Sequence, residues 1–151
     1  MHAQKYRREG FTLIELALVI TLLGLLSAIA IPTYRGYVDR ARENGAIADI
    51  GMMQLQLYRW DLNTGAFPAT LAEAGLGGPD PWGNPYQYAN IALSSPADVR
   101  KDKNLNPINT DFDLYSMGRD GVTVRALTAL DARDDIVRAN NGAFIGRGED
   151  Y

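Results

Sequence analysis

The sequence lacks cysteine and has one histidine, His2, among its 151 residues. Without cysteine there are no disulfides and no thiolate metal sites. Beyond His2 the chain has no Ser-His-Asp triad, no Cys-His pair and no zinc site of the usual ligands. Residue types alone still permit catalysis by paired carboxylates. No two acidic residues are grouped around aromatic ones, however, so we expect a protein that is not an enzyme.

Basic residues are outnumbered, with 15 Lys and Arg against 18 Asp and Glu and a formal net charge of −3. Nucleic-acid binding relies on clustered positive charge, so we expect no nucleic-acid partner. A length of 151 residues leaves room for one modest domain beside a membrane anchor.

One apolar run stands out, at residues 11–31. Of its 21 residues, 16 are Phe, Leu, Ile, Val or Ala, and Glu15 is the only ionisable one. This is long enough to cross a bilayer as a helix. Lys5, Arg7 and Arg8 precede the run, and the positive-inside rule therefore places the N-terminus in the cytoplasm and the rest of the chain outside the inner membrane.

Three interpretations of this run compete. A cleavable secretory signal has a basic start and a small-residue cleavage site, which residues 28–30 (Ala-Ile-Ala) supply. A plain anchor explains the length but not Glu15, because an acidic side chain at the bilayer centre costs roughly 2.5 to 3.5 kcal/mol. The third interpretation rests on a resemblance and gives the carboxylate a partner.

The basic leader ending in Gly10, followed by FTLIE, resembles the processing signal of type IV pilins and type II secretion pseudopilins. In that family a prepilin peptidase cuts after the glycine and methylates the new N-terminus. The resemblance implies that residues 1–10 are a leader, cleaved between Gly10 and Phe11, with N-methylation of Phe11. It also implies that Glu15 pairs with the terminal amine of a neighbouring subunit. Such a pair in apolar surroundings sets register.

The helical pattern continues beyond the apolar run, and we expect one helix over residues 11–63, about 80 Å long at the α-helical rise. Pro32 is expected to bend or locally open it. In the family, Gly24 and Pro32 lie where the helix loosens on leaving the membrane, which makes them candidate assembly residues. Residues 32–63 read as an amphipathic continuation. Its expected apolar face comprises Tyr34, Tyr37, Val38, Ala41, Gly45, Ala48, Met52 and Leu55.

After Asn63 the pattern changes. Residues 70–76 suggest a short second helix, and residues 86–91 alternate as a strand does. The strings DPWGNPYQYANI and DFDLYSMGRDG are similar to segments of the major pseudopilins of type II secretion. We expect Trp82 to pack the turn onto a helix rather than to stack on a ligand.

The predicted fold is therefore α+β and pilin-like: a long N-terminal helix, transmembrane in its first half, packed on a small antiparallel β-sheet. Residues 64–151 would form a periplasmic globular domain with a metal-binding loop.

The resemblance further implies that the loop after DLYSMGRDG holds a calcium ion. Calcium takes six to eight oxygen ligands. The candidate ligands are the carbonyl of Met117 and the carboxylates of Asp120, Asp131, Asp134 and Asp135. Alternatively, these aspartates are solvated, with Arg119, Arg125 and Arg133 as counter-charges.

A second acidic pattern, Asp102, Asn104, Asn106 and Asp113, imitates the spacing of an EF-hand loop. Pro107 occupies the position that requires glycine, so we interpret this match as accidental.

The expected function is that of a structural subunit like the major pseudopilin, which forms a periplasmic filament for type II protein secretion. The alternative is a type IV pilin that works in adhesion, motility or DNA uptake. Many such pilins close a C-terminal disulfide, which this chain lacks. The implied partners are further copies of the chain, the prepilin peptidase, an inner-membrane assembly platform and minor pseudopilins or pilins. The protein would lie in the bacterial inner membrane as a single-pass protein, its filament in the periplasm or on the cell surface.

Overall fold

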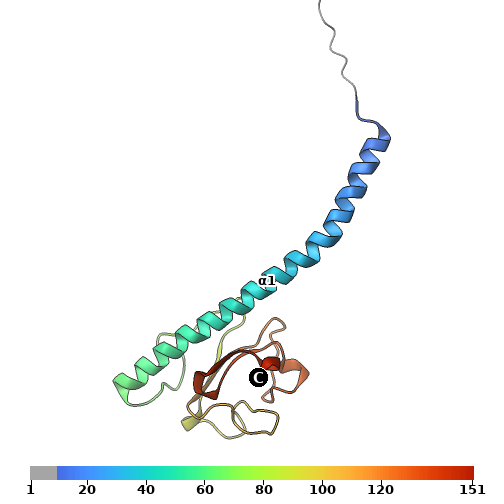
Figure 1. Cartoon of the computed structure of the whole chain (residues 1–151). Coiled ribbons are helices and arrows are strands. Elements are labelled where there is room, and N and C mark those ends of the chain that lie inside the picture. The colour runs from blue at the N-terminus through green and yellow to red at the C-terminus, as the bar shows by residue number, and fades with distance from the viewer. Residues whose placement is uncertain (1–9) are drawn as a thin grey trace, which may run out of the picture. The chain divides into compact units, whose positions relative to one another are not determined.

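A computed structural model describes residues 10–151 (Figure 1). The predicted leader, including His2, falls outside the described residues except for Gly10. The chain divides into two compact units, one ending at Asp39 and one running from Arg40 to Tyr151. Each unit is described by itself.

The long helix α1 spans Leu13–Thr64, which confirms the expected helix within two residues at each end. Its start is a capping box, in which Thr12 and Glu15 bond to each other's backbone N–H groups. It ends at Gly65, whose positive φ of 83° allows its N–H to bond Asp61 O at 2.7 Å. The helix continues through Pro32.

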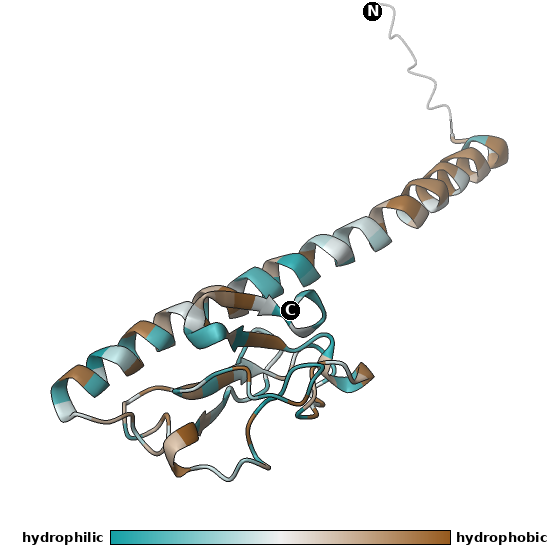
Figure 2. Cartoon of the chain, turned by 60° about the horizontal axis from the view of Figure 1, so that its bottom comes forward, coloured by the Kyte–Doolittle hydropathy of each residue, from teal (hydrophilic) through white to brown (hydrophobic). Residues whose placement is uncertain are grey.

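In the first unit every residue from Gly10 to Tyr37 is exposed. Within the described part of the chain, α1 is the one helix long and apolar enough to cross a membrane. Figure 2 shows its N-terminal part coloured almost entirely as hydrophobic. No part of the chain among residues 10–151 covers this apolar segment.

In the second unit α1 buries one face, and it is not the predicted one. Met52 and Leu55, assigned to the apolar face, are 58% and 64% exposed. The helix carries apolar residues on more than one side, so periodicity alone did not select the face that packs. The stripe that faces the core comprises Ala46, Ile50, Met53 and Leu57.

The second unit contains one four-stranded antiparallel sheet in the order β1-β2-β3-β4. Strand β2 pairs with β1 from Gln87↔Tyr115 to Asn90↔Phe112, and β3 pairs with β4 along its whole length. The strands are β1 (Gln87–Asn90), β2 (Phe112–Ser116), β3 (Ile136–Ala139) and β4 (Phe144–Arg147). Short 3-10 helices cover Ile91–Leu93, Leu130–Ala132, Asn140–Gly142 and Gly148–Asp150. Together with α1 this confirms the α+β pilin-like fold.

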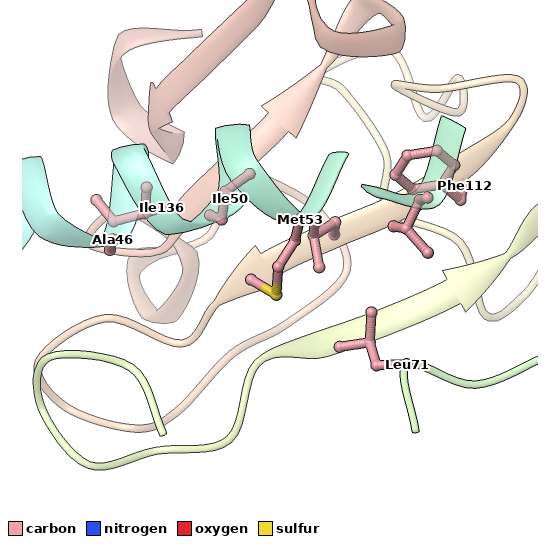
Figure 3. Close-up of a cluster of buried hydrophobic side chains, with 8 residues drawn as sticks. Ala46, Ile50, Met53, Leu71, Phe112 and Ile136 are labelled. Atoms are coloured by element: carbon pink, nitrogen blue, oxygen red, sulfur yellow. The ribbon is translucent and has the colours of Figure 1, made fainter. Parts of the chain in front are cut away.

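The core lies between α1 and the sheet, as Figure 3 shows. Phe112, Leu114 and Ile136 from the strands pack against the buried stripe of α1. Trp82 packs against the same cluster, which confirms its expected structural role.

Residues 70–76 do not form the predicted second helix. They form turns, in which Leu76 N donates to Leu71 O at 2.8 Å. Gly75, Gly77 and Gly78 have positive φ angles that a helix does not accept. Leu71 nevertheless joins the core, so the apolar residues of this segment pack without helical structure.

Candidate functional site

The first candidate site is the start of α1. Gly10 and Phe11 precede the helix and are exposed, so the peptide bond between them lies in accessible chain outside α1. Glu15 Oε2 accepts hydrogen bonds from Thr12 N at 2.9 Å and from Thr12 Oγ1 at 2.8 Å. Both bonds to the Glu15 carboxylate fall on the same oxygen. The sequence Thr-x-x-Glu therefore makes a helix start that is complete within residues 12–15.

Gly24 lies inside α1, and a Cβ atom placed there would have no neighbour within 4 Å. In the single chain it makes no close contact that explains a glycine. Pro32 removes the backbone donor to Ala28 O, and one residue along, Thr33 Oγ1 donates to Ile29 O at 2.9 Å.

The second candidate site is the C-terminal loop, residues 117–135 between β2 and β3. Its two ends lie against each other. Asp134 Oδ2 accepts hydrogen bonds from Arg119 N at 3.0 Å and from Asp120 N at 3.3 Å. A Cβ at Gly118, whose φ is 65°, would come within 2.4 Å of Asp134 O. The glycine is needed for both the backbone angle and the close approach.

The predicted calcium ligands do not converge as a set. Met117 is half-buried, and Asp120 and Asp134 are neighbours through the backbone contacts above. Asp120 Oδ1 accepts from Val122 N at 2.9 Å. Asp131 is exposed, in the short helix Leu130–Ala132. Across residues 10–151, no three acidic or histidine side chains gather closely enough to hold an ion.

Asp135 is fully buried and forms an ion pair with Arg100. Their ion pair joins Arg100 Nη2 to Asp135 Oδ2 at 2.6 Å. Burial raises the pKa of the Asp135 carboxyl, and the charge of Arg100 acts against this rise.

These positions bear on the calcium prediction. Among the described residues, Asp135 Oδ1 is a buried carboxylate oxygen without a hydrogen-bond partner, the kind of atom that an ion could contact. A divalent cation there would sit beside the guanidinium of Arg100 on the other oxygen of the same carboxylate, and like charges repel. The donor set found in the structure therefore does not fit the predicted ion, and calcium stays a prediction that only an experiment can test.

The other acidic patterns have structural roles. Asp102 Oδ1 accepts from Asn104 N and Asn106 N, both at 2.8 Å, and shapes a turn. Asp113 instead lies buried in β2, so the EF-hand spacing is accidental, as expected. Arg125, one of the three proposed counter-charges, pairs with Asp98 at 2.7 Å on the surface.

Sequence reasoning missed two buried arginines. Arg100 lies within the polar loop that precedes β2, which has no periodic pattern, so nothing local indicated its burial. Arg138 lies in β3, and its side chain is fully buried beside Asp111. In both cases the partner is far away in sequence and is brought close only by the fold.

Comparison with known proteins gives a consistent result. Residues 5–31 match the family described as the prokaryotic N-terminal methylation motif. The chain is 31% identical over 140 residues to type II secretion system core protein G of Pseudomonas aeruginosa, covering 78% of this chain and 88% of that protein. It is 32% identical over 142 residues to core protein G of Aeromonas hydrophila, covering 78% and 87%.

Similarity to pilins is shorter. The chain is 38% identical over 72 residues to the type IV major pilin protein PilE1 of Neisseria gonorrhoeae, covering 48% of this chain and 44% of the pilin. The match to core protein G extends over most of both chains, at more than 30% identity. The chain therefore belongs to the pseudopilin family of type II secretion system core protein G.

Proposed function

We propose that the chain is a structural subunit, without catalytic activity, that assembles into a helical filament for type II protein secretion. The similarity to core protein G over most of the chain supports this role. The methylation motif supports processing of the kind that precedes filament assembly.

The observation that carries the proposal is the exposed apolar segment of α1. Every residue from Gly10 to Tyr37 is exposed, including Phe11 at 87% and Leu22 at 51%. An apolar surface of this size needs lipid or other protein to cover it. A helix that is stable both in a bilayer and among copies of itself meets the requirement of a filament subunit that starts in a membrane.

In this proposal the prepilin peptidase cuts between Gly10 and Phe11 and methylates Phe11. The exposed position of this bond ahead of α1 favours access. Residues 11–31 then cross the inner membrane, residues 32–63 continue the helix, and residues 64–151 form the periplasmic domain. The partners are further copies of the chain, the assembly platform of the inner membrane and the minor pseudopilins.

Glu15 has the role of pairing with the terminal amine of a neighbouring subunit. Its carboxylate contacts only Thr12 among the hydrogen bonds found in residues 10–151, so a stronger, charged donor can compete for it. Gly24 permits close approach of a neighbouring helix, because nothing among the described residues lies within 4 Å of its Cβ position apart from its chain neighbours and the nearby backbone of its own helix. Pro32 loosens the helix as it leaves the membrane.

A type IV pilus subunit is the second candidate, favoured by the identity of 38% to PilE1. That similarity covers 48% of this chain. The match to core protein G covers 78% of it. The broader match supports secretion as the leading function.

The test uses a strain in which this chain is the sole major subunit. Wild type, Glu15→Ala and Thr21→Ala are compared for exported protein in the medium, for protein retained in the periplasm, and for filaments by electron microscopy. Thr21 is the matched control, because it is an exposed polar residue of the same segment whose Oγ1 bonds to Ala17 O of its own helix.

We expect Glu15→Ala to insert into the membrane but to lose filaments and to retain exported proteins in the periplasm, while Thr21→Ala behaves as wild type. Normal filament yield from Glu15→Ala would exclude the pairing role. Loss of surface filaments with secretion unchanged would instead favour the type IV pilus.

A further inference from the structure

Arg100 joins the C-terminal loop to the segment that precedes β2. Its side chain is 2% exposed and that of Asp135 is 0% exposed. Arg100 Nη2 donates to Asp135 Oδ2 at 2.6 Å, and Nη1 donates to Thr123 Oγ1. The Thr123 hydroxyl donates in turn to the same Asp135 oxygen at 2.6 Å. One guanidinium thus ties the middle of the loop to its end.

The position of Arg100 is itself held by β2. Its backbone N–H donates to Asp113 Oδ2 at 2.7 Å. The guanidinium carbon lies 4.3 Å from the ring centroid of Tyr115, a distance suited to a cation–π contact. Asn109 Nδ2 donates to the second oxygen of Asp113 at 2.8 Å. These contacts with Asp113 and Tyr115 hold the guanidinium of Arg100 in a fixed orientation toward the C-terminal loop.

Backbone hydrogen bonds connect the same segments. Lys101 N donates to Arg125 O at 2.9 Å, and Leu127 N donates to Lys101 O at 3.1 Å. The residues next to Arg100 thus pair with the middle of the C-terminal loop. This pairing keeps the side chain of Arg100 directed to Asp135 and not to solvent.

We propose that the guanidinium of Arg100 is the built-in cation of the C-terminal loop, and that the loop keeps its fold without a divalent metal ion. A buried carboxylate needs a positive partner. Arginine is always charged and presents several donors in a fixed planar arrangement. Arg100 meets this need from within the chain, at the position where the sequence pattern of the loop implies calcium. The proposal does not depend on filament assembly.

The test measures the melting temperature of the intact chain in detergent micelles by near-ultraviolet circular dichroism, with added calcium and with a chelator. We expect the wild type to melt at the same temperature in both. A calcium site at a hundredfold excess over its Kd would raise the melting temperature by roughly 5 to 15 °C, and such a shift would overturn the proposal. Magnesium serves as the control for ionic strength and charge.

Variants test the arginine directly. Arg100→Gln should lower the melting temperature by about 10 °C or more, because it leaves a buried carboxylate unpaired. Arg125→Gln is the matched control: it removes the same charge from the exposed pair with Asp98, whose side chains are 58% and 57% exposed, and should shift it by about 2 °C or less. Equal effects of the two variants would contradict the proposal.

A double variant separates the pair from each residue alone. Arg100→Gln combined with Asp135→Asn should melt higher than the sum of the two single losses predicts, because the unpaired charge is gone. Strict additivity would count against the pairing. If Arg100→Gln does not fold, the calcium and chelator comparison on the wild type still decides.

Discussion

Arg138 and Asp111 form a bidentate ion pair beneath α1, with Nη1 to Oδ1 at 2.9 Å and Nη2 to Oδ2 at 2.6 Å. The same guanidinium donates from Nε to Gln54 Oε1 at 2.5 Å and from Nη2 to Tyr58 OH at 2.7 Å. It also lies 4.0 Å from the ring centroid of Phe112. The pair therefore connects α1 with β3 and the start of β2 through polar contacts beside the apolar core.

We expect Arg138→Met to destabilise the second unit by about 3 to 5 kcal/mol, since it leaves Asp111 and two helix side chains without their donor. Arg147→Met is the control, because Arg147 pairs with Glu43 at 3.5 Å and Glu149 at 2.8 Å on the partly exposed surface. That change should cost about 1 kcal/mol or less. Chemical denaturation followed by tryptophan fluorescence measures both, and equal costs would show that the bonds of Arg138 add no net stability.

The pH dependence of stability should reflect Asp111. Burial acts to raise the pKa of this carboxyl, but the hydrogen bonds from Arg138 and from Phe112 N outweigh it and hold the pKa below its ordinary value. A depressed pKa contributes stability above the unfolded-state value, and this contribution is lost as the pH falls toward the folded-state value. Acid should therefore weaken the wild type through this group.

The measurement compares wild type with Asp111→Asn in denaturant titrations from neutral pH down to about pH 3. The gap in stability between them should be largest near neutral pH and should narrow in acid. Asp113 is the contrast, because burial raises the pKa of its carboxyl. The difference in stability between wild type and Asp113→Asn should therefore not narrow as the pH falls. A gap that stays constant for Asp111→Asn would contradict the assignment.

The buried face of α1 can be tested with two leucines of the same helix. Leu57 is fully buried and Leu55 is 64% exposed. Leu57→Ala should cost about 2 to 5 kcal/mol, as a large-to-small change in a core does. Leu55→Ala should lie within about 0.5 kcal/mol of wild type. If thermal unfolding showed a larger loss of stability for Leu55→Ala than for Leu57→Ala, the face predicted from periodicity would be the buried one.

Gly118 should tolerate no side chain. Gly118→Ala would require a φ of 65° and place its Cβ 2.4 Å from Asp134 O. Gly65→Ala is matched in backbone strain, with a φ of 83°, but has no atom within 4 Å. We expect Gly65→Ala to cost roughly 1 kcal/mol of stability. Gly118→Ala should cost clearly more, because its Cβ would push Asp134 away from Gly118 and so separate the two ends of the C-terminal loop. Similar melting temperatures for the two variants would show that the close approach of Gly118 to Asp134 can be relieved without loss of stability.

Processing gives the last prediction. The intact mass of the mature protein from membrane extracts should correspond to a chain that begins at Phe11 and carries one added methyl group. A Gly10→Val chain, in which the residue before the cut is branched, should keep its leader. A mature chain that begins at Ile31 would instead establish an ordinary secretory signal and remove the filament hypothesis.

Local signals in the sequence predicted the elements that form locally. The helical pattern predicted α1 within two residues at each end, and alternation predicted β1 within one residue at each end. Strands β3 and β4 were not predicted. Their connection has left-handed Asn140 and Asn141 before Gly142, a turn signal that was present in the sequence but stood in a tail unlike the family.

Long-range partners were harder to predict. Helical periodicity predicted one apolar face of residues 32–63, but the face that the sheet covers is a different one. Likewise, the acidic residues of the C-terminal loop indicated a need for positive charge, and the family pattern suggested a metal ion. The arginine beside Asp135 comes from a loop 35 positions earlier, and no spacing rule links the two.

The two outer strands of the sheet have a consequence for how copies of the chain associate. Strands β1 and β4 lie at the edges of the sheet, and each is four residues long. Edges this short offer few unpaired backbone groups to a neighbour. Growth by adding strand to strand, as in amyloid, is therefore disfavoured from the folded state, whereas the exposed apolar residues of α1 offer a far longer surface to a neighbouring copy.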